Sequence, residues 1–276
     1  MSRRASDAVP TRKSRRELAA MSAAGRIVAG LLDLLEGKAV PGVSTGELDE
    51  IAEQFIRERR GEPSFKGLYG YPATICCAPN DVVVHSIPSG QSVLREGDIL
   101  GVDVGVEVDG LHADGTRTFA IGEIGHRARR LLDATREALA KGIEQAVEGA
   151  TVEDISRAVE THVVAAGYSV VRDLTGHGIG RRVHEAPSVP NFVDHKVFRH
   201  DYGVRLQRGM TLAIEPMVAE GAPRVVQDPD GWTYRTADGK LSAHFEHTVA
   251  VTRGAARVLT VSGERSGDGR GRPRRT

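Results

Sequence analysis

The segment from Gly97 to Phe119, GDILGVDVGVEVDGLHADGTRTF, constrains the fold more than any other stretch of the chain. Valine alternates with other residues before an Asp-Gly dipeptide, which strongly favours a two-residue turn between two strands. The pattern therefore predicts a β-hairpin in which Gly105 lies opposite Asp114. In this register Asp103 and Asp114 are diagonal neighbours on one face of the hairpin, although eleven positions separate them in the sequence.

Two buried carboxylates at this separation must be protonated or must share a cation, because like charges that close raise each other's pKa. A pair of divalent metal ions needs bridging carboxylates at about this spacing. The alternative is a solvated hairpin whose charges face water. The remaining candidate ligands decide between the two interpretations.

Three further segments place polar side chains on strands that are otherwise apolar. His177 and His184 flank the glycines of GHGIGRRVHE, Glu215 ends the strand GMTLAIEPM, and Glu246 lies in the middle of the strand LSAHFEHTVAVT. A single strand glutamate is usually an edge residue and a single histidine is usually structural, but four clustered carboxylates require balancing positive charge. Carboxylates with one imidazole and no thiolate suit Mn, Fe, Co or Zn in a two-metal site that generates hydroxide at neutral pH.

Several other kinds of site are excluded by the sequence. The glycine-rich stretch is not a dinucleotide fingerprint because no GxGxxG opens a helix, and the chain has no GxxxxGK phosphate loop and no HExxH zinc motif. The two cysteines, Cys76 and Cys77, are adjacent and form neither a disulfide framework nor a CxxC metal site. This cysteine content fits a reducing compartment, and we expect the protein in the cytoplasm.

Helix signals and an internal similarity organise the rest of the chain. Ser14 with Glu17, and Ser44 with Glu47, form capping boxes that begin two amphipathic helices. A similar helix pair follows 107 residues later, where Thr151 takes the place of Ser44. This duplication predicts two related halves made of helices and strands, with chance similarity of two helix pairs as the alternative.

The composition predicts a soluble globular protein that has no membrane segment. The 276 residues are 40% hydrophobic and 27% charged, which is enough for a large core in one domain or two small ones. The longest apolar runs are far shorter than the roughly 18 residues of a membrane span. Residues 1–13 and 262–276 are basic and poor in apolar residues, so we expect disordered tails around a single domain at 14–261. Such tails either bind RNA weakly or stay solvated.

Together these motifs resemble those of the type I methionine aminopeptidases. The similarity runs from about residue 17 to 260 and includes PGVSTGELD, HSIPSG, GVDVGVEVDGLHAD, GHGIGRRVHE, GMTLAIEPM and SAHFEHTVAVT in family order. It implies a pita-bread α/β (α+β) fold, in which two pseudo-two-fold-related halves share a curved antiparallel sheet covered by helices. It also implies a monomer that removes the N-terminal methionine from nascent proteins when the second residue is small. Contact with the ribosome would involve the basic tails, and neither a membrane nor a nucleotide is expected as a partner.

The resemblance also implies a set of metal ligands for two divalent ions, which would be Co, Mn, Fe or Zn. Asp103 would chelate one ion, Asp114 and Glu246 would bridge both, and His177 with Glu215 would complete the other. Hydrolysis would then proceed through a metal-bridged hydroxide.

The same resemblance implies roles toward the substrate. His184 would lie at the scissile carbonyl, His85 near the peptide nitrogen, and Glu215 would act as the proton shuttle. The methionine pocket would be formed by Tyr71, Cys76 and Trp232. Around this pocket the chain departs from the usual family residues at Leu68, Ser86, Leu174 and Val183.

Three other classes remain as alternatives. Aminopeptidase P and prolidase share the metal ligands but usually carry an additional N-terminal domain, for which a start near residue 14 leaves no room. A type II methionine aminopeptidase would have a long helical insertion, whereas only 31 positions separate His184 from Glu215. A non-catalytic binding protein of the same fold would lack ligands, and here none is missing.

Overall fold

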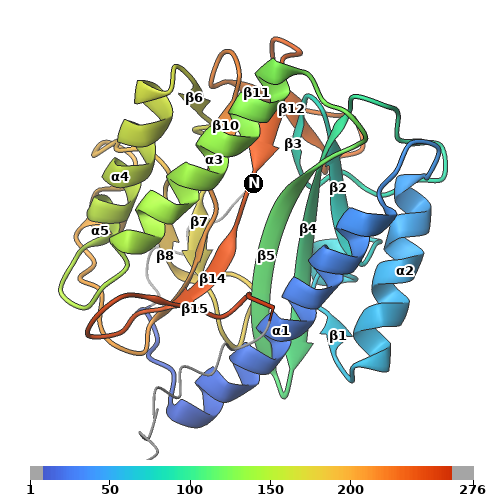
Figure 1. The fold of residues 1–276 in the computed structure, drawn as a ribbon. Coiled ribbons are helices and arrows are strands. Elements are labelled where there is room, and N and C mark those ends of the chain that lie inside the picture. Colours follow the sequence, from blue (N-terminus) through green and yellow to red (C-terminus); the bar gives the residue numbers. More distant parts are fainter. Residues whose placement is uncertain (1–8, 263–276) are drawn as a thin grey trace, which may run out of the picture.

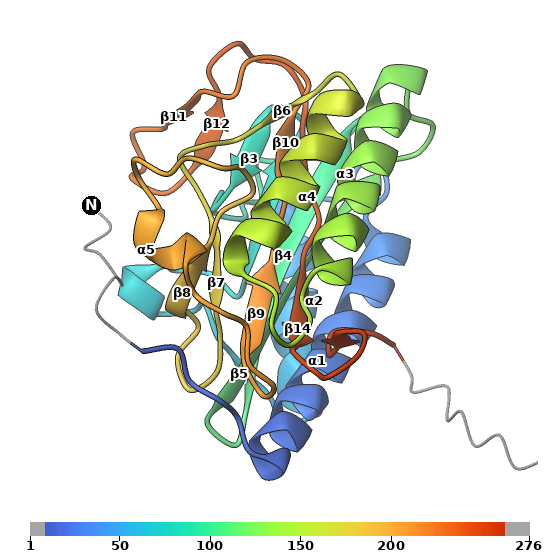
Figure 2. The same ribbon diagram turned by 90° about the vertical axis from the view of Figure 1, so that its left-hand side faces the viewer.

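Four long helices lie against antiparallel strands in the computed structural model, which describes residues 9–262 (Figure 1). Seen from the side, these helices cover one face of the strands (Figure 2). The helices are α1 (Arg15–Lys38), α2 (Thr45–Glu58), α3 (His126–Glu144), α4 (Val152–Ala165) and the short α5 (Arg199–Tyr202), with a 3₁₀ turn, η1, at Leu68–Gly70.

The predicted hairpin forms the centre of the first half. β4 (Ile99–Val108) pairs with β5 (Leu111–Ala120), and Gly105 lies opposite Asp114, so the predicted register is confirmed. Asp109 and Gly110 have φ angles of 52° and 74°, and this left-handed backbone is what a type I′ turn requires. The outer edge of β4 pairs with β1 (Glu62–Pro63) and β2 (Ile75–Pro79), and the apolar faces of α1 and α2 cover the sheet.

The second half is built from shorter strands beneath α3 and α4. Its largest sheet has the order β15-β14-β9-β7-β8, with bounds Arg257–Val258, His247–Ala250, Thr211–Ile214, Gly176–Gly178 and Glu185–Val189. A three-stranded sheet joins β13 (Ser242–His244), β10 (Met217–Ala219) and β6 (Ser169–Val170). A further one joins β11 (Val225–Gln227), β12 (Tyr234–Thr236) and β3 (Val82–Val84).

The internal duplication is visible at the helix starts. The capping boxes predicted at Ser14 and Ser44 are present, and Thr151 caps α4 in the same way. Gly42 and Gly149 precede the two related caps with φ angles of 95° and 93°. The halves therefore repeat the same turn as well as the same helix pair.

One predicted strand is divided in the structure. The prediction that LSAHFEHTVAVT forms a single strand with Glu246 in its middle is wrong. β13 ends at His244 and pairs with β10, whereas β14 begins at His247 and pairs with β9 in another sheet. Glu246 lies in the break, where its backbone N–H donates to the Thr116 carbonyl oxygen of β5 at 2.9 Å. The Glu246 carboxylate therefore interrupts no strand, because it lies between two strands that belong to different sheets.

Threonine side chains join the two halves along β5, which lies beside β14 in Figure 1. The Thr118 hydroxyl donates to the His244 carbonyl oxygen at 2.7 Å and accepts from the His244 N–H at 3.0 Å. The Thr248 hydroxyl makes the same two bonds with the backbone of Asp114, both at 2.8 Å. The hairpin of the first half is thus held against the strands of the second.

Helix α1 bears on the expectation that the chain has no membrane segment. By length and composition alone α1 could cross a membrane, but here it is a core helix of the first half, and most of its apolar residues are buried.

Residues 1–8 and 263–276 lie outside the described residues, so the tails predicted there remain untested. Lys13, which immediately precedes the boundary predicted at residue 14, is buried against Glu185 of β8.

Candidate metal centre and substrate pocket

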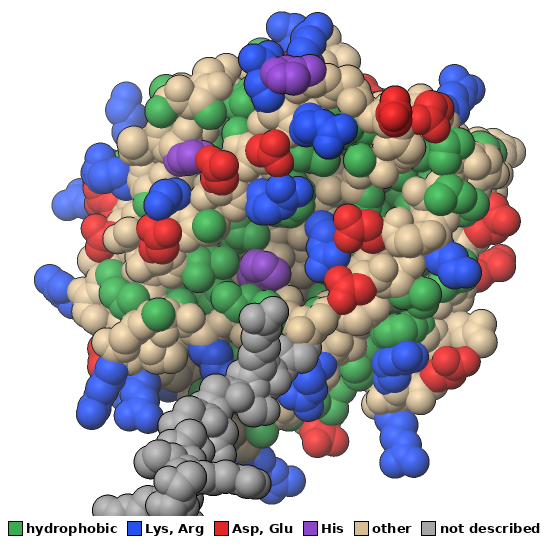
Figure 3. Space-filling model, viewed as in Figure 1, with side chains coloured by type: hydrophobic (Ala, Val, Ile, Leu, Met, Phe, Trp, Pro, Cys, Tyr) green, Lys and Arg blue, Asp and Glu red, His purple; other side chains and the backbone are tan. Residues whose placement is uncertain are grey.

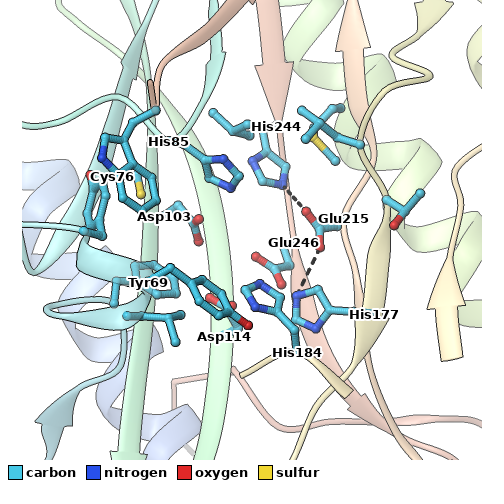
Figure 4. A pocket seen from close by; sticks show the side chains of 18 residues that line it. Tyr69, Cys76, His85, Asp103, Asp114, His177, His184, Glu215, His244 and Glu246 are labelled. Carbon is cyan, nitrogen blue, oxygen red and sulfur yellow. Dashed lines mark ion pairs between the residues drawn. The ribbon is translucent and has the colours of Figure 1, made fainter. Parts of the chain in front are cut away.

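A cavity of about 160 Å³ brings together every site residue that the sequence predicted (Figure 4). Carboxylates from the β4–β5 hairpin meet residues that follow β9 and β13 and the histidine of β7. Histidine and apolar side chains complete the wall. The predicted residues in its lining are Tyr71, Cys76, His85, Asp103, Asp114, His177, His184, Glu215, Trp232 and Glu246.

The five predicted ligands form one connected cluster. Donor atoms of Asp114, His177 and Glu246 all lie within 4.8 Å of one another. The Thr116 hydroxyl lies 2.8 Å from Asp103 Oδ1 and 2.9 Å from Glu246 Oε2, which ties the fourth residue to this group. The fifth, Glu215, places Oε1 3.4 Å from Nε2 of His177.

No lysine or arginine is found among the described residues that line the cavity, so no fixed positive charge faces these carboxylates there. Burial raises the pKa of Asp114, and the nearby Glu246 and Asp103 raise it further. Burial likewise raises the pKa values of Asp103, Glu215 and Glu246. Oδ1 of Asp114 and Oε1 of Glu246 have no hydrogen-bond partner among the described residues. Buried oxygens of this kind fit direct coordination of divalent cations, which would supply the missing charge.

The histidines facing the cavity are held neutral. Burial, together with the neighbouring His184, lowers the pKa of His177 to about 3 and that of His85 to about 4. Nδ1 of His177 lies 3.0 Å from the Gly178 carbonyl oxygen, which can only accept, so Nδ1 carries the proton. The lone pair of Nε2 is then free to face the carboxylates, as in a metal-ligating imidazole.

An apolar slot adjoins the polar cluster. Tyr71 and Trp232 meet edge to face with ring centroids 5.1 Å apart, and Cys76, Phe65 and Val183 pack with them. The Tyr71 hydroxyl is directed away to the carbonyl oxygens of Ile75 and Ser86, both at 3.0 Å. Burial raises the pKa of the Cys76 thiol, which therefore stays neutral. The slot can accept an uncharged, flexible side chain.

His244 and Tyr69 are among the cavity residues that were not assigned from the sequence. His244 is buried with Nε2 3.6 Å from Glu215 Oε2, and the only signal was its place two residues before Glu246. Tyr69 is exposed at the mouth and stacks on His184 with centroids 6.1 Å apart and an interplanar angle of 16°. No periodicity marks Tyr69, because it lies in an irregular turn with φ of 52°.

Comparison with known proteins agrees with this geometry. The model of metallopeptidase family M24 matches residues 19–253. The methionine aminopeptidase of Clostridium perfringens is 48% identical over 249 residues, which are 90% of this chain and 98% of that protein. The crystal structure of methionine aminopeptidase from Thermotoga maritima matches with a TM-score of 0.88 and 40% identity over 92% of this chain and all of that one. An Xaa-Pro dipeptidase from Bacillus anthracis matches with a TM-score of 0.72 and 25% identity. This match covers 91% of the present chain and 62% of the dipeptidase chain. On the family match and on the identity to these relatives, the chain belongs to metallopeptidase family M24.

Proposed function

We propose that this chain is a metal-dependent methionine aminopeptidase that hydrolyses the peptide bond after an N-terminal methionine. The observation that carries the proposal is the apolar slot of Tyr71, Cys76 and Trp232, which lies directly beside buried carboxylate oxygens that have no hydrogen-bond partner among the described residues. The relatives of that name, which cover nearly the whole chain, support the same activity.

We infer that the centre holds two divalent ions, with Asp103, Asp114, His177, Glu215 and Glu246 as ligands. Four carboxylates carry up to four negative charges, which two divalent cations would balance. Bound ions would supply Lewis acidity and a nucleophilic water at neutral pH. The oxygen-rich donor set with one imidazole suits Mn, Fe, Co or Zn.

The other residues of the cavity act on the substrate. A methionine side chain in the slot leaves the scissile bond between the carboxylates and the rings of His85 and His184. An imidazole N–H of His184 donates to the carbonyl oxygen as it becomes an oxyanion, and His85 donates near the peptide nitrogen. Glu215, whose Oε1 lies 3.4 Å from Nε2 of His177 in the same cluster, would take a proton from the nucleophile and return it to the leaving amine.

We also propose that the protein is a cytoplasmic monomer that acts on emerging polypeptides with a small second residue. Its two cysteines are buried and unbridged, which fits a reducing compartment. On the face in Figure 3, acidic and basic side chains are interspersed. A contact with the ribosome through the basic tails stays a prediction, since those residues are not described.

The test is methionine release from Met-Ala-Ser by purified protein, before and after chelation and with each metal restored. We expect activity that is lost with chelator and regained with metal. The dipeptide Ala-Pro is the necessary comparison, because the Xaa-Pro dipeptidases share the fold. Cleavage of Ala-Pro without Met-Ala-Ser would replace the proposal with a prolidase activity. Cleavage of neither by the metal-loaded protein would indicate a binding protein.

A further inference from the structure

A buried ammonium group lies in the segment that precedes α1. Lys13 Nζ is 2.7 Å from Oε2 of Glu185, and the two side chains are only 4% and 7% exposed. The Thr11 hydroxyl donates to the same oxygen at 2.8 Å and accepts from Lys13 Nζ at 2.6 Å. Glu185 directly follows His184 in the sequence. In Figure 2 this segment passes below β8 before it enters the helix.

The other oxygen of Glu185 organises the loop that carries His184. Oε1 accepts the backbone N–H of Arg181 at 2.8 Å and that of Arg182 at 3.2 Å. The Gly180 N–H closes the turn by donating to the Arg182 carbonyl oxygen at 3.1 Å. One carboxylate therefore holds residues 180–184 on one side and the chain before α1 on the other.

The loop is shaped to receive the lysine. A Cβ atom on Gly180 would lie 2.2 Å from Lys13 Cε and 2.6 Å from Nζ, so glycine leaves the space that the side chain occupies. The Lys13 backbone N–H donates to the Gly209 carbonyl oxygen at 2.6 Å, which fixes the lysine from its main chain as well. Lys13 is thus held at both ends, unlike a residue of a solvated tail.

The charge of Lys13 is needed because Glu185 is buried. Burial raises the pKa of Glu185, but the hydrogen bonds from Lys13 and Thr11 hold it below its usual value. Without the ammonium, an ionised carboxylate would remain in a site where its side chain is only 7% exposed. The carboxylate would then protonate, which weakens its hydrogen bonds from the N–H groups of Arg181 and Arg182, or turn toward solvent, which breaks them.

We propose that Lys13 is a positioning residue for His184, acting through Glu185 and the loop at 180–184. The inference rests on the proposed function, which places His184 at the scissile carbonyl. A second ion pair supplies a matched control, because Arg181 and Glu17 also join this loop to α1, at 2.7 Å. That arginine side chain is 70% exposed, so its pair is solvated and contributes little.

The experiment compares Lys13→Met and Arg181→Ala with the parent in the full-length, metal-loaded protein. Displacing a substrate-positioning group by about 1 Å costs on the order of 10² in rate, so we expect Lys13→Met to lower kcat by about 10- to 100-fold. KM and bound metal should change little, and Arg181→Ala should stay within about twofold of the parent. In a His184→Ala background, Lys13→Met should lower kcat no further.

Hydrogen exchange provides a readout that does not depend on the substrate. The amides of residues 181 and 182 should exchange faster in Lys13→Met than in the parent or in Arg181→Ala. If Lys13→Met does not fold, Lys13→Met/Glu185→Leu removes both charges and also the oxygen that accepts the two N–H groups, and it should fold with the same loss of kcat and of protection.

The assignment would be overturned if Lys13→Met left kcat unchanged or left hydrogen exchange in residues 180–184 unchanged. It would also be overturned if Lys13→Met lowered kcat in the His184→Ala background as much as it does in the parent. Faster exchange in a protein that releases no methionine would reject the proposed function while supporting the contact between Lys13 and the loop.

Discussion

Replacing Asp114 by asparagine should have opposite effects on the metal-free and metal-loaded protein. Asp114 is 4% exposed, its Oδ1 has no partner among the described residues, and burial with Glu246 and Asp103 raises its pKa. A neutral amide keeps the shape and removes one of the mutually repelling charges. It cannot bridge two cations as a carboxylate does. We therefore expect a more stable metal-free protein that no longer gains stability or activity from metal.

The size of both effects follows from the burial of the group. Donor atoms of Asp114 and Glu246 lie within 4.8 Å of each other, where two like charges repel by about 3 kcal/mol at an effective dielectric constant of about 20, so Asp114→Asn should stabilise the metal-free protein by up to about that amount. For a chain of this length, each kcal/mol raises Tm by about 2–4 °C. Saturating metal at a hundred times its Kd should stabilise the parent by about 2.7 kcal/mol but the variant by much less.

Thermal unfolding after chelation, with and without added Mn²⁺ or Co²⁺, measures both quantities, and Met-Ala-Ser hydrolysis measures activity. Asp109→Asn is the matched control, since Asp109 is an exposed residue of the same hairpin and asparagine tolerates its φ of 52°. That variant should respond to metal as the parent does. Equal metal stabilisation of Asp114→Asn, or near-parental turnover at saturating metal, would refute the bridging role.

Three further predictions test the rest of the site. His184→Ala should keep its metal but lose on the order of 10² to 10³ in kcat, because the proposed oxyanion donor is removed. Loss of bound metal, measured by elemental analysis, would contradict this role. Met-Ala-Ser should be cleaved far faster than Met-Lys-Ser, since a long second side chain would collide with His85 and His184 where they line the cavity. Equal rates would show that the cavity leaves room for a long second residue. Gly178→Ala should lower Tm, because its Cβ would lie 2.1 Å from the backbone oxygen of Ala186; an unchanged melting curve would show that this strand can shift.

The parts of the fold that the sequence predicted depend on local signals. The hairpin could be placed to the residue because valine alternation and an Asp-Gly turn lie within one short segment. The helix starts could be placed because each capping box is complete within four residues. The candidate ligands stood out because acids are unfavourable in strands unless something compensates for them.

The parts that escaped prediction depend on distant partners. Lys13 belongs to a basic segment whose composition is that of a solvated tail, and its partner Glu185 lies 172 residues away. His85 adopts a φ of 60°, a backbone conformation that only the surrounding structure imposes on a residue other than glycine. The break between β13 and β14 reflects the different sheets with which each pairs, and alternation alone could not locate it.

The two strand breaks explain how the site can exist at all. β9 ends at Ile214 and β10 begins at Met217 in another sheet, so Glu215, like Glu246, lies where the backbone passes between sheets. An acid within either ladder would have to face the core or the helices, whereas at these breaks it faces the cavity. The two aspartates come from the hairpin of the first half and the two glutamates from the second. Cations bound among them would therefore hold the halves together beside the threonine contacts, which is why metal should stabilise the whole fold as well as catalyse hydrolysis.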